Sequence, residues 1–434
     1  MKNEITAKFK DSPLGPIPQD WEVKRLGEIG EPVMCKRVLK SQTSDSGDVP
    51  FYKIGTFGDK ADAYISRSLY EEFKAHYPYP RKGDILVSAA GTIGRTVVFD
   101  GNDAYFQDSN IVWIDHDESK VLNIFLYLCY KNMRWQSEDG GIISRLYNAN
   151  LKAQTIPLPP LPEQRRIAEA LGEMDRLIES LDAQIVKKRR IAQGLAHDLL
   201  GTGNGEQGTG NGECGMRNEP IRRLPGFKGE WVKHSFDEVF ALLRNNTYSR
   251  EFLCDESSNA FDIHYGDILI RYGVIVDVLR EHLPCLKEGV KPNKDYLQDG
   301  DIVFADTAED EMVGKAIEIR GLKGAKVVAG LHTMPCRPRQ GAFAPEFLGY
   351  YLNSDSYHKQ LLPLITGSKV SALSRANFAS TTLFVPPTLA EQRAIAEVLA
   401  AADEEISALE AKKGKYEQIR SGMMRDLLSG RVRI

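Results

Sequence analysis

The chain carries the same C-terminal pattern twice, and this internal repeat constrains its fold more than any other feature. Residues 160–169, PLPEQRRIAE, return as residues 388–397, TLAEQRAIAE, and Asp198–Leu200 returns without a gap as Asp426–Leu428. Residues 19–26 and 229–236 also resemble each other, so the two halves open and close alike, while the residues between these ends diverge. The sequence therefore predicts a tandem duplication with two sites of one kind that recognise two different things.

Each repeat continues as a long amphipathic helix. Apolar residues alternate at spacings of four and three, which is the pattern of a coiled-coil seam, and Pro-Pro pairs at 159–160 and 386–387 mark the helix starts. Lys188, Lys413 and Arg420 interrupt the seam. At about 1.5 Å per residue each helix would span roughly 55–60 Å, the length of a spacer. The residues predicted to form the seam are Ile167, Leu171, Met174, Ile178, Leu181, Ile185, Ile395, Leu399, Ile406, Leu409 and Tyr416.

The regions before the helices show the strand and helix signals of mixed α/β domains. In the first we expect strands at 84–88, 95–99 and 110–114 and a helix at 122–135; in the second, strands at 301–305 and 314–319 and a helix at 345–352. The predicted segments are a first domain at 1–155, a first helix at 156–200, a Gly-rich linker at 201–216, a second domain at 217–385 and a second helix at 386–434.

The connectivity of these segments predicts their topology. The second helix begins at the second domain, so it has to run antiparallel to the first helix in order to bury its seam. The expected fold class is α/β (mixed), with two globular domains separated by two long helices that form an antiparallel coiled coil, and with an internal pseudo-twofold repeat.

Composition excludes several classes of protein. No apolar run in the 434 residues approaches the roughly 20 that a membrane helix needs, and the first residues lack a signal-peptide core, so we expect a soluble, cytoplasmic protein with no membrane partner. The six cysteines have no close pair in sequence, which predicts neither a zinc site nor a disulfide framework. The net charge of -4 implies that any nucleic-acid site is local.

Motifs of a stand-alone enzyme are absent from the sequence. There is no Walker A motif, no His-Glu-x-x-His, no Gly-x-Ser-x-Gly, no cofactor fingerprint and no methyltransferase tetrapeptide. Glu22 and Lys24 resemble part of a nuclease metal site, but Glu22 has no acidic equivalent beside Trp231. We therefore predict no catalytic residue, no metal site and no cofactor in this chain.

Polar and basic residues on divergent loops remain as candidates for contacts with DNA. Arginine and lysine pair with guanine or phosphate, and asparagine and glutamine pair with adenine. For each single residue, a solvated loop position is the alternative. The candidates in the first domain are Lys36, Arg37, Lys40, Ser88, Gly91, Thr92, Arg95, Gln107, Asn110, Arg145, Asn148 and Asn150. Those in the second domain are Arg244, Asn245, Asn246, Arg250, Arg271, Thr307, Lys315, Lys369, Ser371, Ser374, Arg375 and Asn377.

Together these features resemble the specificity subunit of a type I restriction-modification system. The resemblance covers nearly the whole chain: a tryptophan at the opening of each half, Gly-Asp-Ile at 83–85 and 300–302, Ala-Asn at 149–150 and 376–377, and above all the PLPPLPEQRRIA motif from Pro157, which in part recurs before the second helix.

The resemblance implies a function. Each globular domain would be a target recognition domain that reads one half of a split, asymmetric sequence in double-stranded DNA. The helices would set the spacing of the halves and bind two modification (methyltransferase) subunits, and restriction and translocation subunits would join that core. S-adenosylmethionine, ATP and Mg²⁺ would be bound by the partner subunits. A scaffold or adaptor protein with two interaction domains and no affinity for DNA is the alternative.

Overall fold

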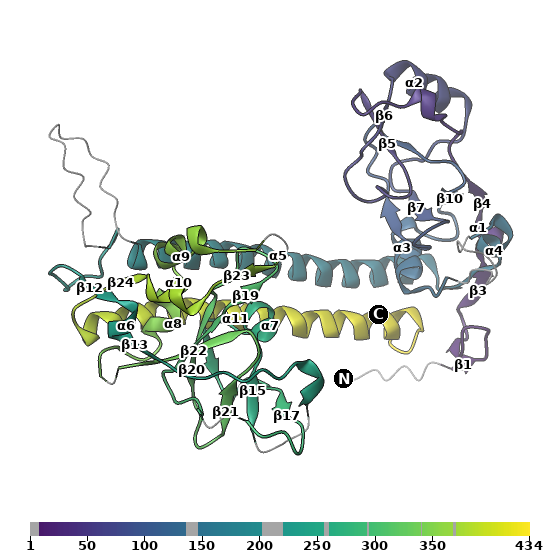
Figure 1. Ribbon diagram of the computed structural model, residues 1–434. Coiled ribbons are helices and arrows are strands. Elements are labelled where there is room, and N and C mark those ends of the chain that lie inside the picture. Colours follow the sequence, from purple (N-terminus) through teal and green to yellow (C-terminus); the bar gives the residue numbers. More distant parts are fainter. Residues whose placement is uncertain are drawn as a thin grey trace. The chain divides into compact units, whose positions relative to one another are not determined.

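The computed structural model describes residues 8–135, 146–201, 220–255, 260–292, 295–339, 341–367 and 370–434. The chain divides into two compact units (Figure 1). The first unit comprises residues 1–182 and 411–434, and the second comprises residues 183–410. Of the predicted features, Arg145, Lys369, Cys214 and the linker beyond Gly201 lie outside the described residues.

Two long helices, α5 (Leu161–Leu200) and α11 (Leu389–Leu428), follow the Pro-Pro pairs and confirm the prediction of two long repeat helices. Within each unit they pack antiparallel. In the first unit Asp182 pairs with Lys413 at 2.7 Å and Asp175 pairs with Arg420. In the second unit Lys188 pairs with Glu405 at 2.6 Å. Each of the three charged residues that interrupt the predicted seam therefore meets a carboxylate on the other helix.

The predicted seam residues lie on the packed side of the helices, with burial that varies along their length. In α11 they are buried near the helix start and half-buried towards the middle, whereas in α5 two half-buried residues lie between a buried pair near the start and another buried pair in the middle. The buried ones are Ile167, Leu171, Leu181, Ile185, Ile395 and Leu399, and the half-buried ones are Met174, Ile178, Ile406, Leu409 and Tyr416. The seam is thus buried where each helix begins and again near the middle of α5.

The first unit is built around an antiparallel sheet in the order β4-β10-β7-β8. A smaller sheet, β6-β5-β9, includes one parallel pair, and β11 pairs with β3 beside the helix start. Its main strands are β3 (Glu22–Arg25), β4 (Glu31–Val33), β5 (Val49–Tyr52), β6 (Tyr64–Ile65), β7 (Ile85–Ser88), β8 (Thr96–Val98), β9 (Tyr105–Phe106), β10 (Ile111–Asp115) and β11 (Thr155–Leu158). Its short helices are α1 (Leu26–Ile29), α2 (Arg67–His76), α3 (Asn123–Asn132) and α4 (Asn148–Ala153), and a hairpin pairs β1 (Phe9–Lys10) with β2 (Ile17–Pro18).

The second unit repeats this plan with an added strand at the edge, in the order β13-β22-β18-β20-β16. A smaller sheet has the order β14-β17-β15-β21, β12 pairs with β24, and β19 pairs with β23. The strands are β12 (Val232–Ser235), β13 (Phe240–Leu242), β14 (Leu253–Cys254), β15 (Phe261–Ile263), β16 (Ile275–Asp277), β17 (Cys285–Leu286), β18 (Ile302–Ala305), β19 (Thr307–Ala308), β20 (Ala316–Arg320), β21 (Val327–Ala329), β22 (Thr333–Pro338), β23 (Ser371–Ala372) and β24 (Thr382–Val385). The short helices are α6 (Phe236–Val239), α7 (Tyr265–Ile270), α8 (Phe347–Tyr351), α9 (Asp355–Leu361) and α10 (Arg375–Ala379).

A central strand, β7 or β18, separates two cores in each unit. Both strands are buried along their length and, apart from Ser88, apolar, because both of their faces are covered. Ile85 and Val87 face the core that includes α3 and the first turns of α5, whereas Leu86 faces the core of the smaller sheet. Ile302 and Phe304 face the helix-side core of the second unit in the same way, and Val303 faces its outer core.

Candidate nucleic-acid interface

In the first unit, three of the predicted loop segments meet at the end of β7. The backbone N–H of Ala89 donates to the carbonyl of Asn110 at 2.7 Å, and the carbonyl of Ala89 accepts from the N–H of Leu146 at 2.8 Å. These two bonds join the loop after β7, the turn before β10 and the segment that leads into α4. We call this meeting point the junction of the first unit.

The second unit has the same junction, built by the same main-chain bonds. The N–H of Asp306 donates to the carbonyl of His332 at 3.1 Å, and the carbonyl of Asp306 accepts from the N–H of Leu373 at 2.9 Å. Because the bonds involve only backbone atoms, the arrangement is independent of the side chains at these positions. The junction is therefore a shared frame for two different sets of side chains.

The side chains carried by the two junctions differ in chemistry. Asp306 replaces Ala89, and His332 replaces Asn110. Two residues after Leu146 and Leu373, Arg375 at the start of α10 takes the place of Asn148 at the start of α4. These pairs of positions are where the two units present different hydrogen-bonding groups.

Segment 34–40 joins the junction of the first unit. Arg37 Nε donates to Asp108 at 3.0 Å, and the N–H of Ser109 donates to the sulfur of Met34 at 3.2 Å. Lys36 lies over the ring of Tyr77, and Lys40 is exposed in a short 3-10 turn. The structure thus brings Met34 and Arg37 to the turn before β10, which is part of the junction, whereas Lys36 and Lys40 have no contact there among the described residues, and Arg145 lies outside those residues.

Several candidates in this unit have structural contacts. The Ser88 hydroxyl is buried, donates to the carbonyl of Thr92 and accepts from the N–H of Arg95, which closes the loop that contains Gly91. Arg95 Nη1 donates to the carbonyl of Phe57 at 2.9 Å, although the residue is exposed. Gln107 accepts from the N–H of Ile54 at 2.9 Å. Asn148 is exposed and Asn150 is half-buried.

In the second unit, Asn245 and Asn246 lie on the loop that follows β13 and contact the segment just before His332 of the junction. Their side-chain amides donate to the carbonyls of Gly330 at 3.3 Å and Ala329 at 3.2 Å, and Asn246 is buried. Thr307 pairs with Ala372 across the short β19–β23 ladder, in which Ser371 opposes Ala308.

Two further candidates shape the start of α10. The Ser374 hydroxyl accepts from the N–H of Asn377, and the Asn377 side chain accepts from the N–H of Ser374, which closes a capping box. Arg375, between them, is exposed. Arg375 therefore stands on a fixed helix end with its side chain in solvent.

The other arginines of this unit differ in their availability. Arg244 forms three hydrogen bonds to the carboxylate of Asp295, two from its guanidinium and one from its backbone N–H, and these lower the pKa of Asp295 to about 2. Arg250 pairs with the buried Asp267 at 2.7 Å. Arg271 is exposed at the end of α7, with its guanidinium over the neighbouring Tyr272 ring.

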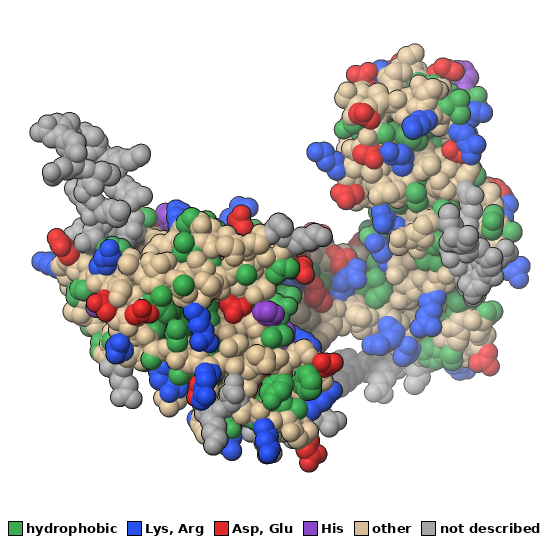
Figure 2. All heavy atoms as spheres, in the orientation of Figure 1, with side chains coloured by type: hydrophobic (Ala, Val, Ile, Leu, Met, Phe, Trp, Pro, Cys, Tyr) green, Lys and Arg blue, Asp and Glu red, His purple; other side chains and the backbone are tan. Residues whose placement is uncertain are grey.

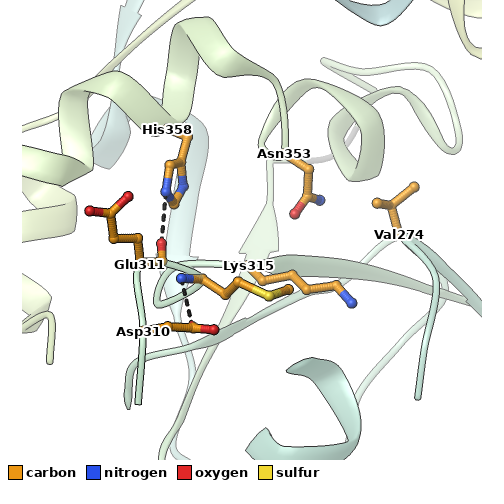
Figure 3. Close-up of a pocket in the computed structure, with 7 residues that line it drawn as sticks. Val274, Asp310, Glu311, Lys315, Asn353 and His358 are labelled. Atoms are coloured by element: carbon orange, nitrogen blue, oxygen red, sulfur yellow. Dashed lines mark hydrogen bonds between the residues drawn. The ribbon is translucent and has the colours of Figure 1, made fainter. Parts of the chain in front are cut away.

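Lys315 faces inward from the loop between β18 and β20. Its ammonium donates to the carbonyls of Tyr272 at 2.8 Å and Leu269 at 3.4 Å, and burial lowers its pKa. It lines a pocket behind this loop with Val274, Asp310, Glu311, Met312, Asn353 and His358. In Figure 3, His358 points at the loop and donates to the carbonyl of Glu311 at 2.9 Å. Lys315 and His358 thus hold the loop from behind.

Sequence patterns missed a cluster of rings beside the second junction. The ring of Tyr265 lies between those of His264 and His332, with centroid distances of 4.7 and 5.2 Å. His332 Nδ1 lies 3.3 Å from the Thr307 hydroxyl and 3.7 Å from an Asp306 oxygen. No local signal marks these residues, because α7 and the turn before β22 meet only in the folded chain.

A buried carboxylate, that of Asp262, lies two residues before His264 of this cluster. Neither oxygen of Asp262 has a hydrogen-bond partner among the residues that the structure describes, and the side chain has no exposed surface. Burial raises the pKa of Asp262 to about 7; nearby Asp267 adds to the shift and Arg250 opposes it. A Cβ atom on Gly330 would lie 2.2 Å from the carboxylate, so only glycine fits at this position.

Charge is mixed over the surface. On the face shown in Figure 2, lysine and arginine are interspersed with acidic side chains, with no continuous basic surface. Across the described ranges, no helix is both long and apolar enough to cross a bilayer. The same residues form no cluster of three or more histidine, cysteine or acidic side chains that could hold a metal ion.

One protein family matches both halves of the chain. Its description is "Type I restriction modification DNA specificity domain", and it matches residues 18–187 and 228–420. A Haemophilus influenzae protein assigned as a type I restriction enzyme specificity subunit is 59% identical over 160 residues, which are 37% of this chain and 42% of that protein. The MjaVIII specificity subunit of Methanocaldococcus jannaschii is 24% identical over 437 residues, 96% of this chain and 94% of the relative.

Solved structures share the fold. The type I restriction-modification S subunit from M. genitalium aligns with a TM-score of 0.53 at 14% identity and covers 98% of both chains. A second structure was solved to explain the assembly and conformational transition of the type I R-M system. One of its chains aligns with a TM-score of 0.56 at 16% identity, covering 96% of this chain and 99% of that one.

Proposed function

Because this chain belongs to the family of type I restriction-modification DNA specificity subunits, we propose that its two junctions are the DNA-reading surfaces of its two target recognition domains. The observation that carries the proposal is the repeated junction. The same backbone bonds at Ala89 and Asp306 present different side chains in the two units. Such a pair suits a bipartite site whose halves differ in sequence, since base edges are read by side chains.

The long helices supply the second part of the proposal. We infer that α5 and α11 keep the two domains at a set spacing and bind two modification subunits, one for each half of the repeat. Restriction and translocation subunits would join this core. The chain is the non-catalytic subunit of its system. S-adenosylmethionine, ATP and Mg²⁺ would therefore act on the partner subunits.

An exchange of domains tests this function. Residues 1–155 are replaced by the corresponding domain of a relative, and the chimaera is expressed with the modification subunits in cells whose methylome is then sequenced. We expect one half of the methylated motif to change and the other half to stay as it was. A change in both halves would contradict the assignment of one reader to each unit.

A salt titration separates this function from the adaptor alternative. Neutralised phosphates release counterions, so the logarithm of DNA affinity should fall linearly with the logarithm of salt concentration. The assembled complex is titrated with labelled duplex that carries the motif and with a scrambled duplex. Equal and salt-independent signals from the two duplexes would favour a protein-binding scaffold.

A further inference from the structure

His332 adopts a backbone conformation that costs a histidine free energy. Its φ is +54°, in the left-handed region that glycine and asparagine enter most easily. The residue sits in the turn directly before β22, and 47% of its side chain is exposed. Strained residues of this kind cluster at binding sites, where the side chain is used. The cost of this conformation therefore points to a function for the ring.

Hydrogen bonds determine which ring nitrogen carries the proton. The Thr307 hydroxyl donates its one hydrogen to Asp306 Oδ1 at 2.9 Å, because a carboxylate can only accept. The Thr307 oxygen, 3.3 Å from His332 Nδ1, is left to accept from an Nδ1–H. A neutral imidazole protonated at Nδ1 has an acceptor at Nε2. The half-exposed ring thus has an acceptor on its other nitrogen.

The surroundings hold this ring in place. Tyr265 packs against it at an interplanar angle of 79°. Asp306 and Thr307 begin the loop that Lys315 and His358 hold from behind (Figure 3). An acceptor in a fixed position discriminates between ligands better than one on a mobile side chain.

We propose that His332 is a base-reading residue of the second unit, and that its Nε2 accepts a hydrogen bond from the exocyclic amine of an adenine or cytosine in the major groove. These amines are the hydrogen-bond donors on the base edges of that groove, whereas guanine and thymine present acceptors. The inference rests on the proposed function, because it assumes that the junction faces DNA. At the equivalent position the first unit has Asn110, so the two units would read this position differently.

Atom-level changes in the DNA test the pairing. The full chain is assembled with its modification subunits, and the methylated motif is determined first. Duplexes are then prepared in which purine replaces each adenine, or 2-pyrimidinone replaces each cytosine, of the half-site read by the second unit, so that the exocyclic amine is lost. One such replacement should weaken binding of the unsubstituted complex roughly 10-fold, the loss typical of one base-edge hydrogen bond. The same replacement should have no effect on the His332→Phe complex.

Control variants separate reading from folding. His332→Gly removes the ring and relieves the backbone strain, so it should unfold at an equal or higher temperature and still lose the 10-fold discrimination. His282→Phe changes an exposed histidine of the same unit and should keep it. Deletion of N7 from the purine of the same base pair should weaken binding of the unsubstituted complex and of the His332→Phe complex equally.

Two results would count against the idea, and they are distinguishable. If the unsubstituted complex bound no duplex specifically, the proposed function itself would fail. If it bound its motif, and His332→Gly and His332→Phe lost as much as the unsubstituted complex on every amine deletion, His332 would not be a reader.

Discussion

The guanidinium of Arg433 donates two hydrogen bonds to the buried carboxylate of Glu163, with Nε 2.8 Å from Oε1 and Nη2 2.6 Å from Oε2. Glu163 lies in the first turn of α5, and Trp21 Nε1 also donates to it at 3.0 Å. In the first unit, the residues that follow α11 are thereby tied to the start of the antiparallel helix.

The second unit has the same pairing of an arginine with a buried glutamate, formed by different residues. Arg223, which follows α5 in the chain, donates through Nε and Nη2 to Glu391 in the first turn of α11, at 2.8 and 2.7 Å. Glu391 is as deeply buried as Glu163. Each long helix therefore begins at a carboxylate that is neutralised by an arginine from beyond the end of the other helix.

Removal of one arginine should destabilise its own unit. Arg433→Ala leaves Glu163 buried without a charge partner, and breaking a buried pair in this way costs about 3–5 kcal/mol, so a value near the lower end is expected for a partly exposed arginine. Faster hydrogen exchange in the first turn of α5 and in residues 17–26, with the second unit unaffected, is the expected readout. Arg431→Ala, at an exposed arginine nearby, is the matched control. An equal effect of Arg431→Ala would contradict a specific role of Arg433 in stabilising Glu163.

The ion pairs between the helices should respond to charge reversal as pairs. Asp175→Arg places two cations together at Arg420 and should lower the free energy of unfolding of the first unit by about 1 kcal/mol, because both side chains are partly exposed. The double change Asp175→Arg with Arg420→Asp should recover most of that loss. Thermal unfolding of the four proteins in the cycle measures the coupling, and strictly additive effects would show that the pair contributes nothing.

Lengthening the helices should lengthen the gap in the DNA motif, provided both helices change. Seven residues inserted after Val186 preserve the heptad pattern and add roughly 10 Å, about three base pairs. The arginine pairs of Glu163 and Glu391 connect each helix start to residues beyond the end of the other helix. An insertion in α5 alone should therefore break one of these pairs. Matched insertions after Val186 and Ser407 should give unchanged half-sites with a wider gap. A methylation motif with its original gap would contradict the role of the helices as a spacer.

Arg375 and Lys315 should behave differently although both were predicted to contact DNA. Arg375→Ala should cost about 1–3 kcal/mol in specific binding and relax one base position, if the exposed guanidinium meets a guanine. Lys315→Ala should instead lower thermal stability, because two carbonyls lose their donor. Binding to cognate and single-mismatch duplexes, measured beside unfolding, separates the two effects, with Arg280→Ala as an exposed control.

The stability of the second unit should fall as pH rises from about 4 to about 7. Asp262 has a pKa of about 7 in the fold against an ordinary 3.8, so the folded chain holds a proton that the unfolded chain releases over this range. The favourable contribution is complete below pH 4 and lost above pH 7. Asp262→Asn should therefore raise the unfolding temperature at pH 8 and reduce its pH dependence between about 4 and 7, leaving the part contributed by Glu318, whose pKa burial also raises to about 7. Glu281→Gln, at an exposed acid, should reproduce the steeper profile of the unsubstituted chain.

Much of the fold was predictable because its signals are local or periodic. The apolar runs at 84–88 and 301–305 became β7 and β18, and the heptad spacing with the Pro-Pro pairs fixed the starts of α5 and α11. The equivalence of Arg223 and Arg433 was hidden, since residues after Gly201 separate Arg223 from its helix and have no counterpart before Arg433.

The candidate surface was less predictable, because its geometry depends on contacts between distant segments. Residue type marked Ser88, Asn246 and Lys315 as polar groups suited to DNA, but their side chains bond within the fold. His332 and Tyr265 lack a sequence motif and meet through the pairing of strands. In the same way, cysteines that are remote in sequence, Cys254 and Cys285, stand opposite each other in the β14–β17 register.

The junctions at Ala89 and Asp306 have an evolutionary consequence. Their bonds pass through peptide groups, which every substitution other than proline leaves in place. Mutations at the neighbouring side chains can therefore accumulate with little loss of stability. In the proposed function, selection can then act on these mutations for their effect on DNA recognition. The host of such a system would be able to acquire a new target sequence by point mutation as well as by exchanging a whole domain.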